Sequence, residues 1–155
     1  AMGKKKVEEV PCGEICAIMG IDGFEFVEFA APAGQVHHLH DYFRKLGFVQ
    51  VARHKTRPIS TYRQGDCTFL INEDPDSFAA RFAAQHGPSA CGFAIRVKKL
   101  AEWARVQALK NGARSIEYKE TSKAVAAPVI EGIGGCMPTS SSALQPTIRQ
   151  KAGFT

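Results

Sequence analysis

Three histidines and an aspartate lie within six residues, in the sequence VHHLHD at positions 36–41. Imidazole and carboxylate groups bind transition metals, and residues three or four apart share one face of a helix. His37 could therefore share a metal ion with His40 or with Asp41. Two ligands on a solvated helix bind weakly, because no neighbouring groups orient the imidazoles. We expect a solvated helix face with a partly buried His40, and His37, His40 and Asp41 are only weak surface candidates for metal binding.

The surrounding residues predict the helix that carries this cluster. Apolar residues recur at helical spacing, and Gly47 is a natural stop. The predicted buried stripe of the helix consists of Val36, Leu39, Phe43 and Leu46.

Strand patterns lie on both sides of this helix. Aromatic residues with a period of two predict a strand over residues 23–32, and a hairpin is expected around Gly65-Asp66. A second helix would begin near Asp76, and a third follows residue 97. Further strands are expected at 48–54, 59–64, 67–72, 90–97, 114–118 and 127–133. The order is a β-α-β-β-β unit used twice, which predicts an α+β fold of two modules with helices outside a curved mixed sheet and a bowl inside.

Several stretches resemble the amino-terminal half of bacterial 4-hydroxyphenylpyruvate dioxygenase: IDGFEFVEFAAP, LGFVQVARH, YRQGD, DSFAARFAAQHGPSAC, FAIRV and PVIEGIGG. The resemblance covers residues 21–135, and HGPSAC together with EGIGG makes it specific. It implies the vicinal oxygen chelate fold of the glyoxalase and bleomycin-resistance superfamily. The paired modules of that fold agree with the repeat inferred from the sequence.

The resemblance also implies where a metal would lie. In that superfamily, a histidine on the first strand of each module and a carboxylate on a last strand project into the bowl. In the dioxygenase they bind Fe²⁺ in the carboxy-terminal half. Here Phe26 takes the place of the first histidine, and Gly92, or Cys91, takes that of the second. Phenylalanine and glycine side chains cannot ligate iron, so we expect no catalytic residue, no metal centre and no cofactor in this chain.

The inner face of the bowl carries the candidates for ligand binding. Glu28 shares a face with Phe26, and Arg63 and Arg96 are expected to point inward, where Glu28 could neutralise one of them. One interpretation is a structural ion pair. The other is an anion-binding cup for a small aromatic acid, with Phe26, Glu28, Arg63 and Arg96 as its residues.

Cys91 is a further candidate, because His86 precedes it across a Gly-Pro turn. A cysteine beside a histidine could act as nucleophile and base. Cysteine is also among the most buried residue types, so we expect a packed structural thiol.

Composition limits the class of protein. The chain has 155 residues and a formal charge of +5, part of it from Lys4 to Lys6. No segment interleaves basic and aromatic residues as a nucleic-acid surface would. No apolar run reaches the length of a membrane span and no signal peptide precedes the fold. The cysteine count of five is odd, and Cys12 and Cys16 have no second pair to complete a zinc site. We therefore expect a cytoplasmic protein that binds neither nucleic acid nor membrane.

The two ends depart from the domain pattern. Residues 1–20 predict a flexible arm, residues 21–135 the vicinal oxygen chelate-like domain, and residues 136–155 a divergent tail. Pro138, Pro146 and the serines at 140–142 do not form a strand pattern, so the last strand is expected to be weak or missing. Its neighbour would then be an open edge, and open edges pair with other chains. We expect a homodimer through that edge.

Three functions are compatible with these observations. The first is a dioxygenase-like amino-terminal domain of tyrosine catabolism that lacks the iron triad and serves as a non-catalytic binding or assembly module. The second is a metal-dependent dioxygenase or glyoxalase-type enzyme, acting on an aromatic 2-oxo acid, whose site is completed by dimerisation. The third is a small-molecule sequestering protein.

Overall fold

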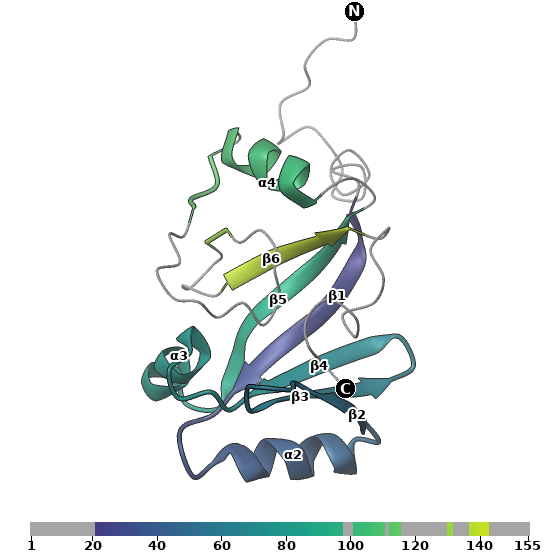
Figure 1. The fold of residues 1–155 in the computed structure, drawn as a ribbon, viewed down its shortest axis with the longest axis vertical. Coiled ribbons are helices and arrows are strands. Elements are labelled where there is room, and N and C mark those ends of the chain that lie inside the picture. Colours follow the sequence, from purple (N-terminus) through teal and green to yellow (C-terminus); the bar gives the residue numbers. More distant parts are fainter. Residues whose placement is uncertain (1–20, 98–100, 111, 116–129, 132–136, 143–155) are drawn as a thin grey trace, which may run out of the picture.

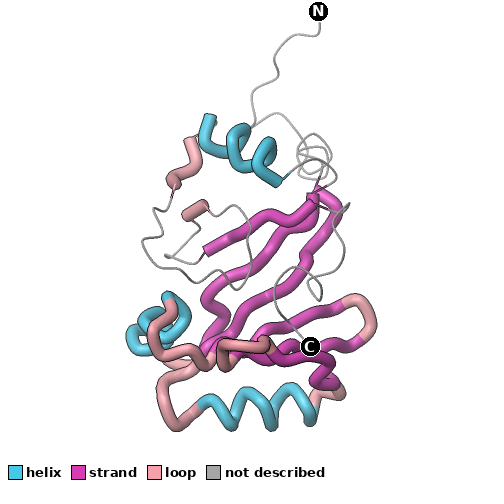
Figure 2. The backbone as a smooth tube through the Cα atoms, in the orientation of Figure 1, coloured by secondary structure: helices cyan, strands magenta, loops and turns pink. Residues whose placement is uncertain are grey.

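The computed structural model describes residues 21–97, 101–110, 112–115, 130–131 and 137–142, and the strands and helices of this part are shown in Figures 1 and 2. None of the described helices is both long and apolar enough to cross a bilayer. The elements are, in order, β1 (Ile21–Ala30), α2 (Val36–Lys45), β2 (Val49–Arg53), β3 (Ile59–Gln64), β4 (Cys67–Asn72), α3 (Phe78–His86), β5 (Ser89–Val97), α4 (Ala101–Lys110) and β6 (Met137–Ser142).

The strands form one mixed sheet in the order β2-β3-β4-β1-β5-β6. In the first module, β1 pairs in parallel with β4, and β4, β3 and β2 follow as antiparallel neighbours. β5 repeats this scheme by pairing in parallel with β6, and the two modules meet where β1 and β5 pair antiparallel. The prediction of an α+β fold with paired modules is confirmed.

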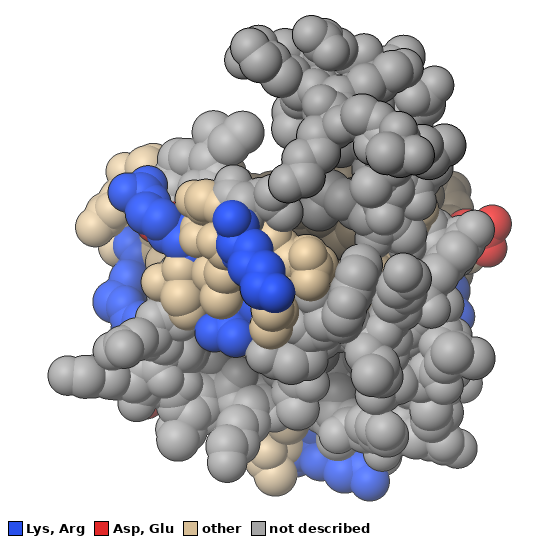
Figure 3. Space-filling view, turned by 90° about the horizontal axis from the view of Figure 1, so that it is seen from above, with Lys and Arg blue, Asp and Glu red and all other residues tan. Residues whose placement is uncertain are grey.

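Only part of the second module is described. An antiparallel bridge joins Ser115 to Ile130, within the strands expected at 114–118 and 127–133. The other residues of those two strands lie outside the described part of the chain. An ion pair of 2.7 Å between Arg114 and Glu131 supports the same bridge. Figure 3 views the protein from the α4 end, and most of its visible Lys and Arg side chains lie on the left of that view.

The last strand was expected to be weak or missing; it is present, because β6 runs from Met137 to Ser142. Its residues pair with β5 in register, so that Pro138 lies beside Phe93 and Ser140 beside Ile95. Proline is tolerated in a strand when its missing N–H faces away from the ladder, which is possible at a sheet edge. β6 is the last strand of the described part of the sheet. The proposed boundary at residue 135 itself stays a prediction.

An aromatic core holds α2 against the outer face of the sheet (Figure 1). Phe43, Phe48, Tyr62 and Ile71 are buried there, with Phe29, Val36, Leu39 and Phe69 packed against them. The predicted stripe of α2 is confirmed except at Leu46, which is 52% exposed. Leu46 is the C-cap, and Gly47 at a φ of 86° ends the helix and leads the chain into β2.

The helix α3 begins one residue later than expected. Ser77 is its N-cap, and its hydroxyl accepts from the amide of Ala80 at 3.1 Å. The sequence analysis assigned the cap to Asp76, because serine and aspartate cap helices about equally well. α3 packs its alanines against Ala30 and Cys91 of the central strands.

The face of the sheet opposite α2 is named the inner face. It carries a second buried cluster with one residue from each of five strands: Phe26, Ala52, Ile59, Leu70 and Ala94. Since side chains alternate along a strand, Glu28, Thr61 and Asn72 lie on this face too. The register agrees, because Leu70 is the partner of both Glu28 and Thr61, and Ile59 is the partner of Asn72.

Candidate functional site

Glu28 is the carboxylate of the inner face, and β1 places it between β4 and β5. Its partner on β4 is Leu70 and its partner on β5 is Gly92, which has no side chain. Phe26 lies two residues earlier on the same face and is buried. The carboxyl group therefore has apolar neighbours on two sides and no side chain on the third.

One side-chain hydrogen bond orients the Glu28 carboxyl group. Asn72 donates from Nδ2 to Glu28 Oε1 at 2.6 Å. The orientation of the Asn72 amide is fixed, because its Oδ1 accepts a hydrogen bond from the backbone N–H of Asp74 at 2.9 Å. A 180° rotation of the amide would break this bond. Burial raises the pKa of Glu28, and the bond from Asn72 lowers it by a smaller amount. The net result favours the neutral acid more than in an exposed glutamate.

Thr61 adds an unusual feature to the same face. Its hydroxyl oxygen is buried and has no hydrogen-bond partner in the described part of the protein. Buried polar groups without a partner are rare, since burial removes their bonds to water. The inner face thus has a carboxyl group on β1 and an unsatisfied hydroxyl on β3, one on each side of Leu70.

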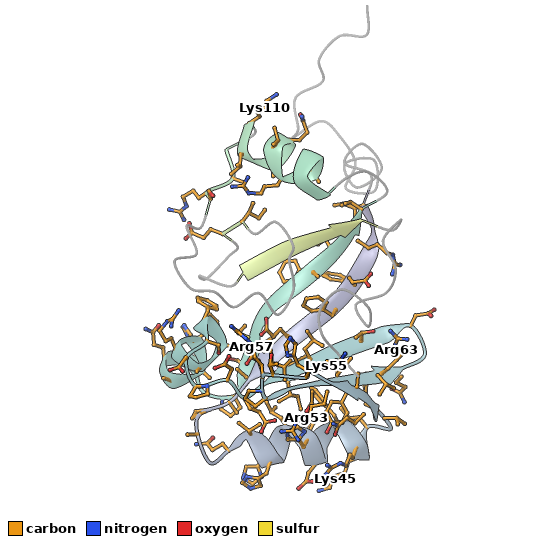
Figure 4. The ribbon with its side chains drawn as sticks, viewed as in Figure 1. Lys45, Arg53, Lys55, Arg57, Arg63 and Lys110 are labelled. Carbon is orange, nitrogen blue, oxygen red and sulfur yellow. The ribbon has the colours of Figure 1, made fainter. Side chains whose placement is uncertain are left out.

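The structure brings together only two of the four predicted ligand-binding residues. Phe26 and Glu28 are neighbours on the inner face. Arg96 forms an ion pair of 3.5 Å with Glu25 rather than with Glu28. Arg63 is exposed near the end of β3, where Figure 4 shows it beside the hairpin. Alternation along the strands could not predict the partner of Arg96, because a β-bulge between Phe24 and Phe26 shifts Glu25 relative to β5.

The three candidate metal ligands on α2 have separate surroundings. His37 is exposed and its ring lies against that of His38. Asp41 binds Arg44 through an ion pair of 3.1 Å. Both ring nitrogens of His40 contact protein groups: Nδ1 lies 2.7 Å from Tyr62 Oη, and Nε2 lies 3.3 Å from Glu73 Oε2. No three His, Cys, Asp or Glu side chains of the described residues are placed to hold one metal ion.

Sequence reasoning missed the polar network around Tyr62. Besides His40, its hydroxyl contacts Gln50 Oε1 at 3.3 Å. Burial raises the pKa of Tyr62, and the nearby Arg44 opposes that effect. Tyr62 is fully buried, so this chain of groups joins α2 to β2, β3 and the end of β4 rather than facing a substrate. The only signal in the sequence was the expected partial burial of His40.

Cys91 and His86, the candidate nucleophile and base, each contact other groups. Cys91 is buried, and its thiol donates to the backbone oxygen of Glu28 at 3.5 Å. His86 packs its ring against Phe82, with 4.3 Å between centroids. Cys91 therefore has the surroundings of a structural thiol. Cys12, Cys16 and Cys136 lie outside the described residues, as do the arm at 1–20 and most of the tail.

The sequence analysis expected Phe26, and Gly92 or Cys91, at the places of two iron-binding histidines, and this correspondence stays a prediction. Phe26 packs its ring into the inner-face cluster, Gly92 has no side chain, and Cys91 is buried. β6 has the sequence MPTSSS, without a carboxylate. Ferrous iron prefers imidazole and carboxylate ligands, and these residues supply neither.

Known proteins resemble this chain over most of its length. The family described as hydroxyphenylpyruvate dioxygenase, HPPD, N-terminal matches residues 16–139. Hemolysin VllY of Vibrio vulnificus is 42% identical over 120 residues, which are 77% of this chain and 33% of that protein. The 4-hydroxyphenylpyruvate dioxygenase of Pseudomonas sp. strain P.J. 874 is 42% identical over 117 residues, 76% of this chain and 32% of the enzyme.

A solved structure supports the same likeness. It is a xylose isomerase-like TIM barrel/4-hydroxyphenylpyruvate dioxygenase fusion protein, with a TM-score of 0.75 and 27% identity over 87% of this chain and 21% of the fusion protein. The chain thus spans about a third of the length of the curated relatives that it matches.

Proposed function

Because this chain belongs to the family of hydroxyphenylpyruvate dioxygenase amino-terminal domains, we propose that it is a non-catalytic binding or assembly module. In this proposal the domain binds a small aromatic acid or a protein partner in the cytoplasm and has no iron centre of its own. Its biological setting would be tyrosine catabolism, and the likeness to a 4-hydroxyphenylpyruvate dioxygenase supports this part of the proposal.

One observation carries the proposal. Phe26, which the resemblance assigns to the position of a metal-binding histidine, packs its buried ring with Ala52, Ile59, Leu70 and Ala94. A side chain in such a core contributes to stability, and its place cannot be taken by an ion without opening the cluster. The inner face therefore supports binding and folding better than oxygen chemistry.

The second candidate is an enzyme that acquires its metal between two subunits. The observation in its favour is Glu28, a carboxyl group on the inner face with one side-chain bond. A carboxylate from each of two copies would still need imidazole ligands. We therefore place this function second.

The experiment measures iron binding and turnover on the 155-residue chain. The purified protein is incubated with Fe²⁺ under argon, desalted, and analysed for metal; oxygen uptake is then followed with 4-hydroxyphenylpyruvate. We expect substoichiometric iron and no uptake above that of free Fe²⁺. One iron per chain together with turnover would disprove the proposal and favour the second candidate.

The oligomeric state is a separate part of the proposal. β6 is the outermost described strand on one side of the sheet. The outermost strand of a sheet has backbone N–H and C=O groups that can pair with another chain. We propose a homodimer formed through this edge. Sedimentation velocity over a range of concentrations tests it, and a monomer throughout would contradict it.

A further inference from the structure

We propose that the β2–β3 loop, residues 54–58, is an acid-sensitive latch that stays closed only while the His54 imidazole is neutral. The closed loop binds the segment that follows β4, and protonation of His54 releases it. Three features support the latch: the acceptor role of the His54 ring, the charges along the loop, and the bonds between the loop and residues 73–74. The latch would operate whether or not the domain binds a ligand or a metal.

The His54 ring closes the loop by accepting hydrogen bonds from it. Its Nδ1 lies 3.2 Å from the backbone nitrogens of Thr56 and of Arg57, which both donate to it. The hydroxyl oxygen of Thr56 lies 3.4 Å from the same ring nitrogen. A ring nitrogen accepts only through a lone pair, so this arrangement requires a neutral ring with its proton on Nε2. An imidazolium would instead direct an N–H group at two backbone N–H groups.

The charges along the loop act in the same direction. Arg53 and Lys55 adjoin His54 in the sequence, and Arg57 provides one of the two donating amides. Figure 4 labels the side chains of Arg53, Lys55 and Arg57. Like charges placed close together disfavour the charged form of a histidine. A protonated His54 would add a fourth positive charge to this short segment.

The closed loop is bound to the segment that follows β4. Arg57 forms an ion pair of 3.3 Å with Asp74, and the carbonyl oxygen of Pro58 accepts from the amide of Glu73 at 2.9 Å. Glu73 in turn lies 3.3 Å from His40 of α2. The carboxylates on this segment are therefore those of Asp74 and Glu73, and each has a basic partner other than His54. Opening the loop would weaken contacts at the end of β4 that reach α2.

His40 responds to acid in the opposite sense. Its Nε2 lies beside the Glu73 carboxylate, so a protonated His40 strengthens the contact between α2 and Glu73. Acid therefore strengthens one contact of Glu73 while it breaks the bonds inside the loop. The two effects are separated by following the loop amides rather than the stability of the whole domain.

The direction of the pH effect follows from the number of bound protons. A histidine in an unstructured chain takes up its second proton near about pH 6.5. The open loop can bind this proton, whereas the closed loop loses its Nδ1 bonds when it does, so acid favours the open loop. For one proton, the ratio of open to closed loop should rise by up to about tenfold for each pH unit below about 6.5.

The test measures the exchange of the Thr56 and Arg57 amides with water by NMR on the 155-residue chain, between about pH 5 and pH 8. The parent is compared at each pH with His54→Asn, which cancels the intrinsic pH dependence of exchange. An asparagine oxygen accepts from the amides that follow it and does not titrate. We expect equal rates near about pH 8 and a parent that exchanges faster below about pH 6.5, by up to about tenfold per pH unit.

Two further variants complete the comparison. His54→Ala has no acceptor at this position, so both amides should exchange fast at every pH. The matched control is His37→Asn, because His37 is exposed on α2 and its ring lies against that of His38. This control should leave the pH dependence of the loop amides unchanged. Circular dichroism checks that each variant is folded.

A second measurement needs no variant. The ring nitrogen resonances of His54 in the parent protein report which nitrogen carries the proton, and we expect Nε2 near about pH 8. A proton on Nδ1 at that pH would overturn the latch. The same conclusion would follow if the parent and His54→Asn exchanged at equal rates over the whole pH range, or if His54→Ala left both amides protected. The proposed binding role is decided separately by the metal and oxygen measurements.

Discussion

The two modules of this protein share a pairing scheme but differ in the residues that carry it. In the first, β4 has the sequence CTFLIN and lies between β3 and β1. In the second, β6 has the sequence MPTSSS and lies at the edge of the described sheet. Each nevertheless pairs in parallel with the first strand of its own module. The backbone arrangement can therefore repeat where the side chains do not.

The difference has a physical reason. A strand with a neighbour on each side needs apolar residues on both faces, and Phe69, Leu70 and Ile71 supply them in β4. Strand pairing itself uses backbone groups that every residue except proline supplies in full. We therefore expect stability to be concentrated in the first module, and the following predictions test that expectation.

The largest effect is expected from Phe43→Ala. The Phe43 ring is 4% exposed and contacts the rings of Phe29, Phe69 and Tyr62. Its removal leaves a cavity under α2 and should lower the free energy of unfolding by about 3–5 kcal/mol. Urea unfolding measures this loss. The control is Phe24→Ala, since Phe24 is 64% exposed, and a loss as large as that of Phe43→Ala would contradict the comparison.

A smaller effect is expected from Tyr62→Phe. The change keeps the buried ring but removes the hydroxyl that contacts His40 and Gln50. We expect a loss of about 1–3 kcal/mol, because those partners lose a hydrogen bond in a partly buried place. The matched control is Tyr42→Phe, because Tyr42 on α2 is exposed. Equal stability of the two variants in urea would show that the network contributes nothing.

The second module should respond in the opposite direction. Ser140 and Ser142 lie beside Ile95 and Val97 in the register of β5 and β6. The double substitution Ser140→Val, Ser142→Val raises the strand propensity of β6 and should stabilise the protein by up to about 1 kcal/mol. Thermal unfolding measures the gain. A loss of stability would mean that the low strand propensity of the two serines does not limit the stability of β6.

The smallest effect is a change in pH dependence at Glu28. Its pKa is raised in the folded protein, so the folded state binds more protons than the unfolded state between the unfolded and the folded pKa. The stability of the parent protein should therefore fall as the pH rises from about 4.5 through the folded pKa. Glu28→Gln cannot ionise, and its stability curve should be flatter over that window. Parallel curves from thermal melts at a series of pH values would refute this assignment.

Much of the first module could be predicted from the sequence. The hairpin of Ile59–Gln64 and Cys67–Asn72 agrees with the predicted ranges, because a Gly-Asp turn between alternating strands is a local signal. The helix of Val36–Lys45 followed from its spacing of apolar residues in the same way. The last strand was expected to be weak or missing, and β6 is present because pairing with β5 overrides a weak local pattern.

The candidate site was predicted less well than the fold. Alternation along β1 was enough to put Phe26 and Glu28 on one face, and the spacing on α2 was enough to leave His37 exposed. These local patterns could not show that Arg96 would bind Glu25, or that His40 would bind Tyr62 and Glu73. These contacts join residues far apart in the chain, and they depend on register and on a β-bulge.

By itself, then, the sequence determined the periods of the strands and helices, the order of the modules and the residue types on each face. These follow from steric and hydrophobic preferences that act over a few neighbouring residues. Only the tertiary structure decided which polar groups meet: Asn72 with Glu28, His40 with Tyr62, and no partner in the described chain for Thr61. A hydrogen bond depends on distances of a few tenths of an ångström, which are set when the whole sheet is assembled.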